Sequence, residues 1–124
     1  MGHYQELLVF QKAFGLAGEI FQLTKSFPSD EKYGLVSQIR RSSRSVCSNL
    51  AEGYRKRRYP AHFVSKLTDA DMENTETEVW IDFAESCNYI NEEQKDKLKF
   101  QVKEIGKLLN FMIRNPQKFQ EKKL

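Results

Sequence analysis

This chain contains few residues that could form covalent cross-links or bind a metal ion. Among its 124 residues are only two cysteines, Cys47 and Cys87, and two histidines, His3 and His62. Two cysteines are too few for a disulfide scaffold. We predict that they lie about 25 Å apart along neighbouring helices, beyond bonding distance, and that both are small buried side chains. No metal site is expected, because neither histidine follows a glutamate by three residues, as in a di-iron bundle.

Proline and long apolar runs are also scarce. The three prolines, Pro28, Pro60 and Pro116, mark breaks between longer segments. No run of about 18 apolar residues is present that could span a membrane. The N-terminal residues lack the basic and then apolar order of a secretory signal. We therefore expect a cytoplasmic protein without a membrane partner.

Signatures of catalysis are absent as well. The sequence contains neither a glycine-rich phosphate loop nor a Gly-x-Ser-x-Gly nucleophile motif. A serine-rich run at residues 42–48 has no histidine base nearby in the sequence. On a helix, these serines would allow close packing or bond to the preceding turn. We expect no enzymatic activity and no cofactor.

What the chain does contain is apolar residues at helical spacing. Hydrophobic residues make up 40% of the sequence and aromatic residues 12%, which is enough for the core of one domain over residues 1–124. Apolar side chains recur every three or four residues, and no alternating strand pattern occurs. The expected helices cover approximately residues 4–25, 30–56, 60–87 and 92–114, followed by a short polar tail at residues 115–124.

Local signals support these boundaries. Asp30 is a candidate N-cap of the second helix, and Pro60 fits the first position of the third. Asn91 and Gln94 have the spacing of a capping box before the fourth helix. Because four long helices are joined by short turns, we predict an all-α, antiparallel, up-down-up-down four-helix bundle.

The first expected helix has a wide apolar surface. One series of side chains includes Phe10, Phe14 and Phe21, and a second series, about 100° away around the helix, includes Leu16 and Ile20. One neighbouring helix cannot cover both series. Either this helix is deeply buried in the bundle or it also meets another subunit. Since the helices are long for so small a chain, we expect a homo-oligomer.

Charge is divided unevenly between the second and third helices. Residues 30–58 contain eight basic and three acidic side chains, a net charge of +5, whereas residues 59–91 contain one basic and seven acidic ones, a net charge of −6. The opposite charges either pair with one another or leave a basic surface facing an anionic partner. Because exposed ion pairs contribute only about 0–1 kcal/mol each, charge pairing alone does not decide between these alternatives.

If the basic surface faces an anionic partner, its function would be to bind the phosphates of a nucleic acid. The turn after the second helix is dense in positive charge, and Tyr54 or Tyr59 could stack on an unpaired base of structured RNA. The alternative function is a protein–protein interaction scaffold, or an accessory subunit, without direct nucleic-acid contact. The candidate nucleic-acid-binding residues are Arg40, Arg41, Arg44, Arg55, Lys56, Arg57 and Arg58.

Several motifs resemble those of one bacterial family. They are Leu8–Ala13 (LVFQKA), the pattern Leu23-Thr24-x-x-Phe27-Pro28-x-x-Glu31-x-Tyr33-Gly34-Leu35, Gln38–Arg41 (QIRR) and Ser45–Tyr54 (SVCSNLAEGY). In this order they resemble the rRNA intervening-sequence proteins, and the similarity extends over approximately residues 8–112.

The resemblance implies a small antiparallel bundle without enzymatic activity, often assembled as a homopentamer with a central opening. Some members are encoded within insertions in large-subunit rRNA genes, and a related branch provides accessory subunits of reverse transcriptases that contact nucleic acid and the polymerase. The third helix departs from the family, with Met72-Glu73 and Thr75–Glu78 where relatives usually have a Gly-Ser pair and more leucines. Arg40 and Arg41 match charged family positions, and interface or bundle roles are implied for Asn49, Glu52, Gly53 and Tyr54.

Overall fold

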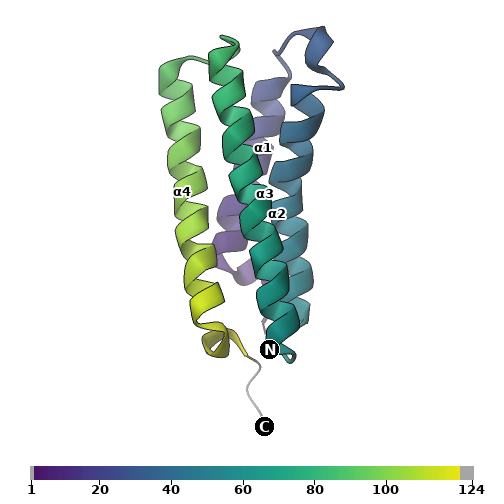
Figure 1. Cartoon of the computed structure of the whole chain (residues 1–124), viewed down its shortest axis with the longest axis vertical. Helices are drawn as coiled ribbons and strands as arrows, with labels where there is room; N and C mark the ends of the chain where they lie inside the picture. Colours follow the sequence, from purple (N-terminus) through teal and green to yellow (C-terminus); the bar gives the residue numbers. More distant parts are fainter. Residues whose placement is uncertain (1, 121–124) are drawn as a thin grey trace.

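The structure is a computed structural model that describes residues 2–120. Figure 1 shows four long helices side by side, with the chain reversing direction at each connection, which confirms the predicted antiparallel bundle. The helices are α1 (Leu8–Thr24), α2 (Leu35–Arg55), α3 (Pro60–Ser86) and α4 (Glu92–Arg114). Three short 3-10 turns accompany them: η1 (Tyr4–Glu6), η2 (Ser29–Glu31) and η3 (Pro116–Phe119).

The core lies along the bundle axis and is built from the predicted apolar stripes. Each helix contributes large side chains that are at most 2% exposed, such as Ile20, Leu50, Leu67 and Leu109. The polar middle of α3 still packs inward, because Asn74 and Thr77 are buried there and bond to neighbouring helices. These hydrogen bonds offset part of the cost of burying the polar groups, since Asn74 Oδ1 accepts no hydrogen bond from the described residues.

The first helix begins later than predicted. We expected it from residue 4, but residues 4–6 form the separate turn η1, and Leu7 is extended with a ψ of 130°. The Glu6 carboxylate accepts a hydrogen bond from the His3 backbone N–H at 3.1 Å. This local bond closes a short turn that competes with continuation of α1.

The second helix also begins later than predicted, and Asp30 is not its N-cap. Residues 29–31 form η2, and Gly34, with φ of −108° and ψ of −113°, separates η2 from α2. The Glu31 side chain accepts from the Leu35 backbone N–H at 3.1 Å and from the Tyr89 hydroxyl at 2.9 Å. Glu31 therefore satisfies a free donor of the α2 terminus and ties it to the α3–α4 turn.

Two further boundary signals are confirmed. Pro60 is the first residue of α3. Asn91 accepts from the Gln94 backbone N–H at 2.8 Å, and Gln94 accepts from the Asn91 N–H at 2.9 Å, which completes the capping box before α4.

The expectation that both cysteines are buried is wrong, and the C-terminal tail contains regular structure. Cys87 is exposed, because it follows the last residue of α3 in the turn to α4, whereas Cys47 is partly buried beside the core. The predicted polar tail contains the ordered turn η3, in which Phe119 packs against the core and against the Phe111 ring at 6.2 Å. Residues 121–124 of that tail lie outside the described residues.

Over residues 2–120, no helix combines the length and the apolar character needed to cross a membrane. The same part of the chain contains no group of three or more histidine, cysteine or acidic side chains arranged to hold a metal ion.

Candidate nucleic-acid interface

The predicted basic residues of α2 do not form one continuous surface. They separate into a group near the middle of the helix, Arg40, Arg41 and Arg44, and a group at its C-terminal end and in the following turn, Arg55 to Arg58. The partners of each side chain decide whether its positive charge is available to an external anion.

Arg40 is a structural residue between α1 and α2. Its Nε donates to Thr24 Oγ1 at 2.9 Å, and its Nη2 donates to the backbone carbonyl of Phe21 at 3.3 Å. Its guanidinium also lies 4.5 Å from the centre of the Phe21 ring. Because its guanidinium bonds to the C-terminal end of α1, Arg40 stabilises that free helix terminus.

Arg41 is paired with α3. Its guanidinium binds both oxygens of Glu73, at 3.2 and 3.3 Å, and forms a short bond to Glu76. These hydrogen bonds, first to Glu73 and then to Glu76, raise the pKa of the Arg41 guanidinium above its usual value. At this position the predicted pairing of α2 with acidic α3 is the correct alternative.

Arg44 lies on the rim of an apolar groove between α1 and α2. Its side chain is exposed, and its guanidinium is 5.5 Å from the centre of the Phe21 ring. Phe10 and Phe14, whose rings stack at 5.9 Å, line the same groove, which has a volume of about 670 Å³. The wide apolar surface predicted for the first helix is thus only partly covered within the chain, and Phe14 remains 66% exposed.

The turn between α2 and α3 presents part of the predicted basic cluster. Arg55, Lys56 and Arg58 are exposed, and the structure gives no ion pair for Arg55 or Lys56 with any described residue. Arg57, by contrast, is only 7% exposed and lies with its guanidinium 3.6 Å from the centre of the Tyr54 ring. The expectation that Arg57 belongs to an exposed basic cluster is wrong.

The two tyrosines near this turn, Tyr54 at the end of α2 and Tyr59 in the turn itself, also differ in how much of the ring is available. Tyr54 is covered by Arg57 on one face, so that face cannot stack on a base. Tyr59 is 54% exposed and makes an edge contact with His62 at 6.1 Å. We name Arg55, Lys56, Arg58 and Tyr59 the basic corner.

The motif residues of α2 contribute to the bundle. Gly53 is buried where α3 crosses, and a Cβ atom there would lie 2.9 Å from the Cβ of Lys66. Glu52 pairs with Lys66 at 2.8 Å. Asn49 donates to the Ser45 carbonyl at 2.9 Å. Gly53 therefore permits the close approach of α3, and Glu52 adds an ion pair across the same contact.

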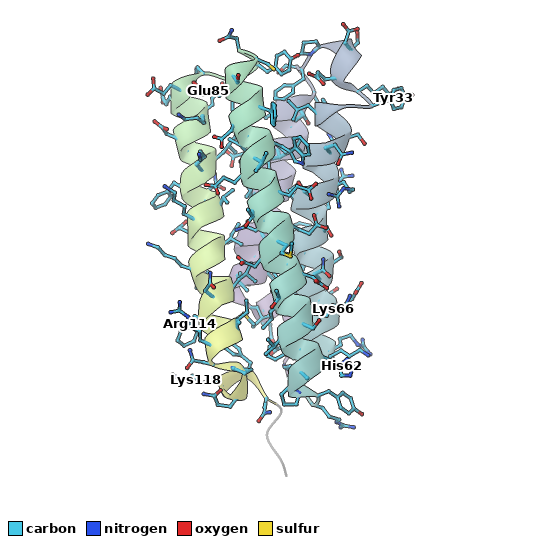
Figure 2. The ribbon with its side chains drawn as sticks, viewed as in Figure 1. Tyr33, His62, Lys66, Glu85, Arg114 and Lys118 are labelled. Carbon is cyan, nitrogen blue, oxygen red and sulfur yellow. The ribbon has the colours of Figure 1, made fainter. Side chains whose placement is uncertain are left out.

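Sequence analysis missed a second basic group, which lies on α4. Lys103, Lys107 and Arg114 are exposed, and Lys118 follows in η3. Figure 2 shows Arg114 and Lys118 at the same end of the bundle as His62 and Lys66, whereas Glu85 and Tyr33 lie at the opposite end. The sequence signal for this group is the spacing of Lys103, Lys107 and Arg114, which places them on one face of the helix.

Comparison with known proteins supports the family resemblance of the sequence motifs. The family model described as 23S rRNA-intervening sequence protein matches residues 5–111. A crystal structure of a protein of unknown function from the S23 ribosomal protein family of Bacteroides thetaiotaomicron superimposes with a TM-score of 0.77 and 30% sequence identity, over 86% of this chain and 96% of that protein. No curated protein matches the chain.

Proposed function

Because the chain belongs to the 23S rRNA-intervening sequence protein family, we propose that it is a non-enzymatic, oligomeric bundle that binds structured RNA through the basic corner. Neither the family description nor the name of the structural neighbour mentions an enzymatic activity. The protein would bind such an RNA in the cytoplasm.

The observation that carries the proposal is the exposure of Arg55 and Lys56 in the absence of an acidic partner among the described residues. Positive charges close to each other at a surface repel, and a phosphate backbone relieves that repulsion while releasing its own counterions. Tyr59 adds an exposed ring on which an unpaired base can stack. Charge and aromatic surface thus occur together at one turn.

Assembly with further copies of the same chain is the second part of the proposal. The α1–α2 groove is apolar, with Arg44 on its rim. On α3, Met72, Val79 and Phe83 are 67%, 44% and 52% exposed, and the exposed Asp69 lies beside Met72. An apolar surface with a basic rim is complementary to one with an acidic rim. Copies joined through two unlike surfaces form a ring when the rotation between neighbours closes, and the family resemblance suggests a ring of five.

RNA binding is tested by removing charge from the basic corner. Arg55→Ala/Lys56→Ala should weaken binding of a labelled RNA duplex and lower the slope of log K against log salt by up to about 2, since each lost duplex phosphate contact lowers it by about 0.9. Arg57 stays unchanged because its removal would disturb packing. Lys25→Ala/Lys32→Ala is the matched control, since both lysines are exposed at the opposite end of the bundle.

A double variant that binds like the wild type would contradict the assignment of the corner. A wild-type protein that binds no RNA even at low salt would leave the interaction scaffold as the function. The pairing of Arg41 with Glu73 favours that second candidate, because it shows that some of the basic charge of α2 serves packing within the chain.

Assembly is tested by light scattering on the wild type and on Phe14→Glu and Met72→Glu. The wild type should have a mass several times the 14.6 kDa of one chain, and both variants should dissociate, because each introduces a carboxylate into an apolar contact. Phe100→Ser, at an exposed residue outside both surfaces, should leave the mass unchanged. A monomeric wild type would contradict this part of the proposal.

A further inference from the structure

The C-terminal half of α4 carries a line of basic side chains on one face. Lys103, Lys107 and Arg114 fall within about 40° around the helix axis and extend along about 16 Å of it. All three side chains are exposed. Lys118 of η3 continues the line, and its ammonium group lies 5.1 Å from the centre of the Phe111 ring. We name these four residues the α4 strip.

The lysines in the two halves of α4 differ in whether they form ion pairs with neighbouring helices. In the N-terminal half, Lys97 pairs with Glu19 at 3.0 Å, and Lys99 pairs with Asp82 at 2.9 Å. In the C-terminal half, no ion pair within residues 2–120 involves Lys103, Lys107 or Arg114. The nearest carboxylate in the sequence, Glu104, instead pairs with Lys12 of α1 at 3.6 Å. The basic charge of the strip is therefore not neutralised by neighbouring helices.

Stabilisation of the helix terminus does not account for this arrangement. Basic side chains favour the negative end of a helix only within its last turn. Of the strip residues in α4, only Arg114 lies in that turn. Lys103 and Lys107 are further from the terminus and four residues apart, so they repel each other without gaining from the helix dipole.

The surface beside the strip is open. A shallow depression of about 700 Å³ lies on the outer face of α4, along Lys103, Lys107, Arg114 and Phe111. The Phe111 ring is 46% exposed. Positive charge that follows an open surface binds a phosphate backbone. The Phe111 ring adds apolar area beside it, with the Lys118 ammonium group over the ring and Phe119 packed against it.

We propose that the α4 strip is a second phosphate-binding site and that one RNA molecule contacts both this strip and the basic corner. The proposal rests on the RNA-binding function proposed above and extends it to residues outside α2. Both sites lie toward the same end of the bundle, since Arg114 and Lys118 share that end with His62, three residues after Tyr59 (Figure 2). An RNA laid across this end would meet positive charge from α2, α4 and η3.

The experiment compares four proteins in their binding to a labelled RNA duplex of about 20 base pairs over a range of salt concentrations. They are the wild type, the strip variant Lys103→Ala/Lys107→Ala, the corner variant Arg55→Ala/Lys56→Ala and the control Lys25→Ala/Lys32→Ala. Each variant removes two positive charges from exposed positions. Circular dichroism and thermal unfolding establish that each variant keeps the wild-type fold.

The strip variant should bind about tenfold more weakly than the wild type at low salt, and the salt slope should fall by up to about 2. Combining the strip and corner variants should lower the slope by the sum of the two changes, because one RNA loses contacts at both sites. The control should change the slope little, since its charges lie at the other end.

The remaining outcomes separate the two proposals. If only the corner variant weakens binding, the strip proposal fails and the proposed function stands. If only the strip variant weakens binding, the strip is the RNA site and the corner assignment fails. A strip variant that equals the Lys25/Lys32 control shows an effect of net charge alone and overturns the inference. A wild type without RNA affinity overturns both proposals.

Discussion

The hydroxyl groups of Ser42 and Thr77 meet at 2.8 Å in the centre of the bundle and join α2 to α3. Both residues are 0% exposed. The Thr77 hydroxyl also contacts the Glu73 carbonyl at 2.9 Å, and the Ser42 hydroxyl contacts the Ile39 carbonyl at 3.3 Å. The buried hydroxyl pair therefore fixes the axial position of one helix against the other without a charged group.

Replacing either hydroxyl of this pair should destabilise the protein, because the hydrogen bond between the two helices is lost. We expect Ser42→Ala to lower the free energy of unfolding by about 0.5–1.5 kcal/mol, because the buried bond to Thr77 is lost while Thr77 keeps its bond to the Glu73 carbonyl. Thr77→Val should have a similar effect. The double variant should lose less than the sum of the two single losses, which urea unfolding of all four proteins would measure. Strictly additive losses would show that the two hydroxyls do not interact energetically.

The close contact between Gly53 and α3 leads to a second prediction, which concerns the stability of Gly53→Ala. Replacing glycine by alanine inside a helix normally stabilises it by up to about 1 kcal/mol. At Gly53 the new Cβ would lie 2.9 Å from Lys66 Cβ and 3.6 Å from the Phe63 carbonyl oxygen. Since Cβ of Lys66 cannot move without α3, Gly53→Ala should destabilise the protein by about 1–3 kcal/mol.

Gly15 provides the matched control in α1, because a Cβ atom there would meet nothing within 4 Å. Gly15→Ala should therefore raise the melting temperature, whereas Gly53→Ala should lower it. Equal shifts in the same direction would mean that backbone preference, rather than the approach of α3, determines the effect at residue 53.

The fold followed from the sequence because apolar residues recur at helical spacing in all four helices, whereas a side-chain N-cap is present only before α4. Asn91 lies in the predicted capping box. The errors fall where a side chain bonds to its own backbone or to a distant turn. Glu6 closes η1 and Glu31 bonds to Tyr89, 58 residues away. No short-range spacing indicates the second of these contacts.

The candidate site was less predictable, because charge in a sequence does not specify its partners. Arg41 and Arg55 are both basic residues of α2, but Arg41 meets two carboxylates of α3, and Arg55 lies beyond their reach at the end of the helix. Arg57 lies next to exposed residues, yet it is buried by stacking on Tyr54. These differences depend on how the helices are rotated against one another.

The two cysteines should differ in reactivity. Burial raises the pKa of the Cys47 thiol to about 11, whereas Cys87 is exposed. Because the thiolate is the reactive form, iodoacetamide at pH 8 should label Cys87 within minutes and Cys47 mainly after unfolding. Mass spectrometry of the labelled peptides would measure this, and Cys87→Ser should remove the fast phase. Rapid labelling of Cys47 in the folded protein would contradict its burial.

The raised pKa of Cys47 also makes stability depend on alkaline pH. The ordinary thiol pKa is 9.0 and the folded value about 11, so the unfolded chain loses its thiol proton first as pH rises. The contribution is therefore fully present below pH 9 and declines between pH 9 and 11, at about 1.4 kcal/mol per pH unit. Urea unfolding of the wild type and Cys47→Ala at pH 8 and pH 10 isolates this decline, which should be absent from the variant.

Arg41 should contribute little to RNA binding as long as Glu73 and Glu76 neutralise it. Arg41→Ala should therefore leave the salt slope unchanged, and because this pair is largely exposed it should change stability by only about 0–1 kcal/mol. Glu73→Gln/Glu76→Gln keeps hydrogen-bond acceptors for Ser45 and Trp80 but removes the two negative charges.

Removal of those charges should make Arg41 available and strengthen binding of the RNA duplex, with a steeper salt dependence by about 1. Adding Arg41→Ala to the double glutamine variant separates this gain from the general loss of negative charge, because only a gain that acts through Arg41 disappears in the triple variant. If Arg41→Ala alone lowered the salt slope as much as Arg55→Ala/Lys56→Ala does, Arg41 would be a phosphate contact. Its ion pairs with α3 would then break when RNA binds.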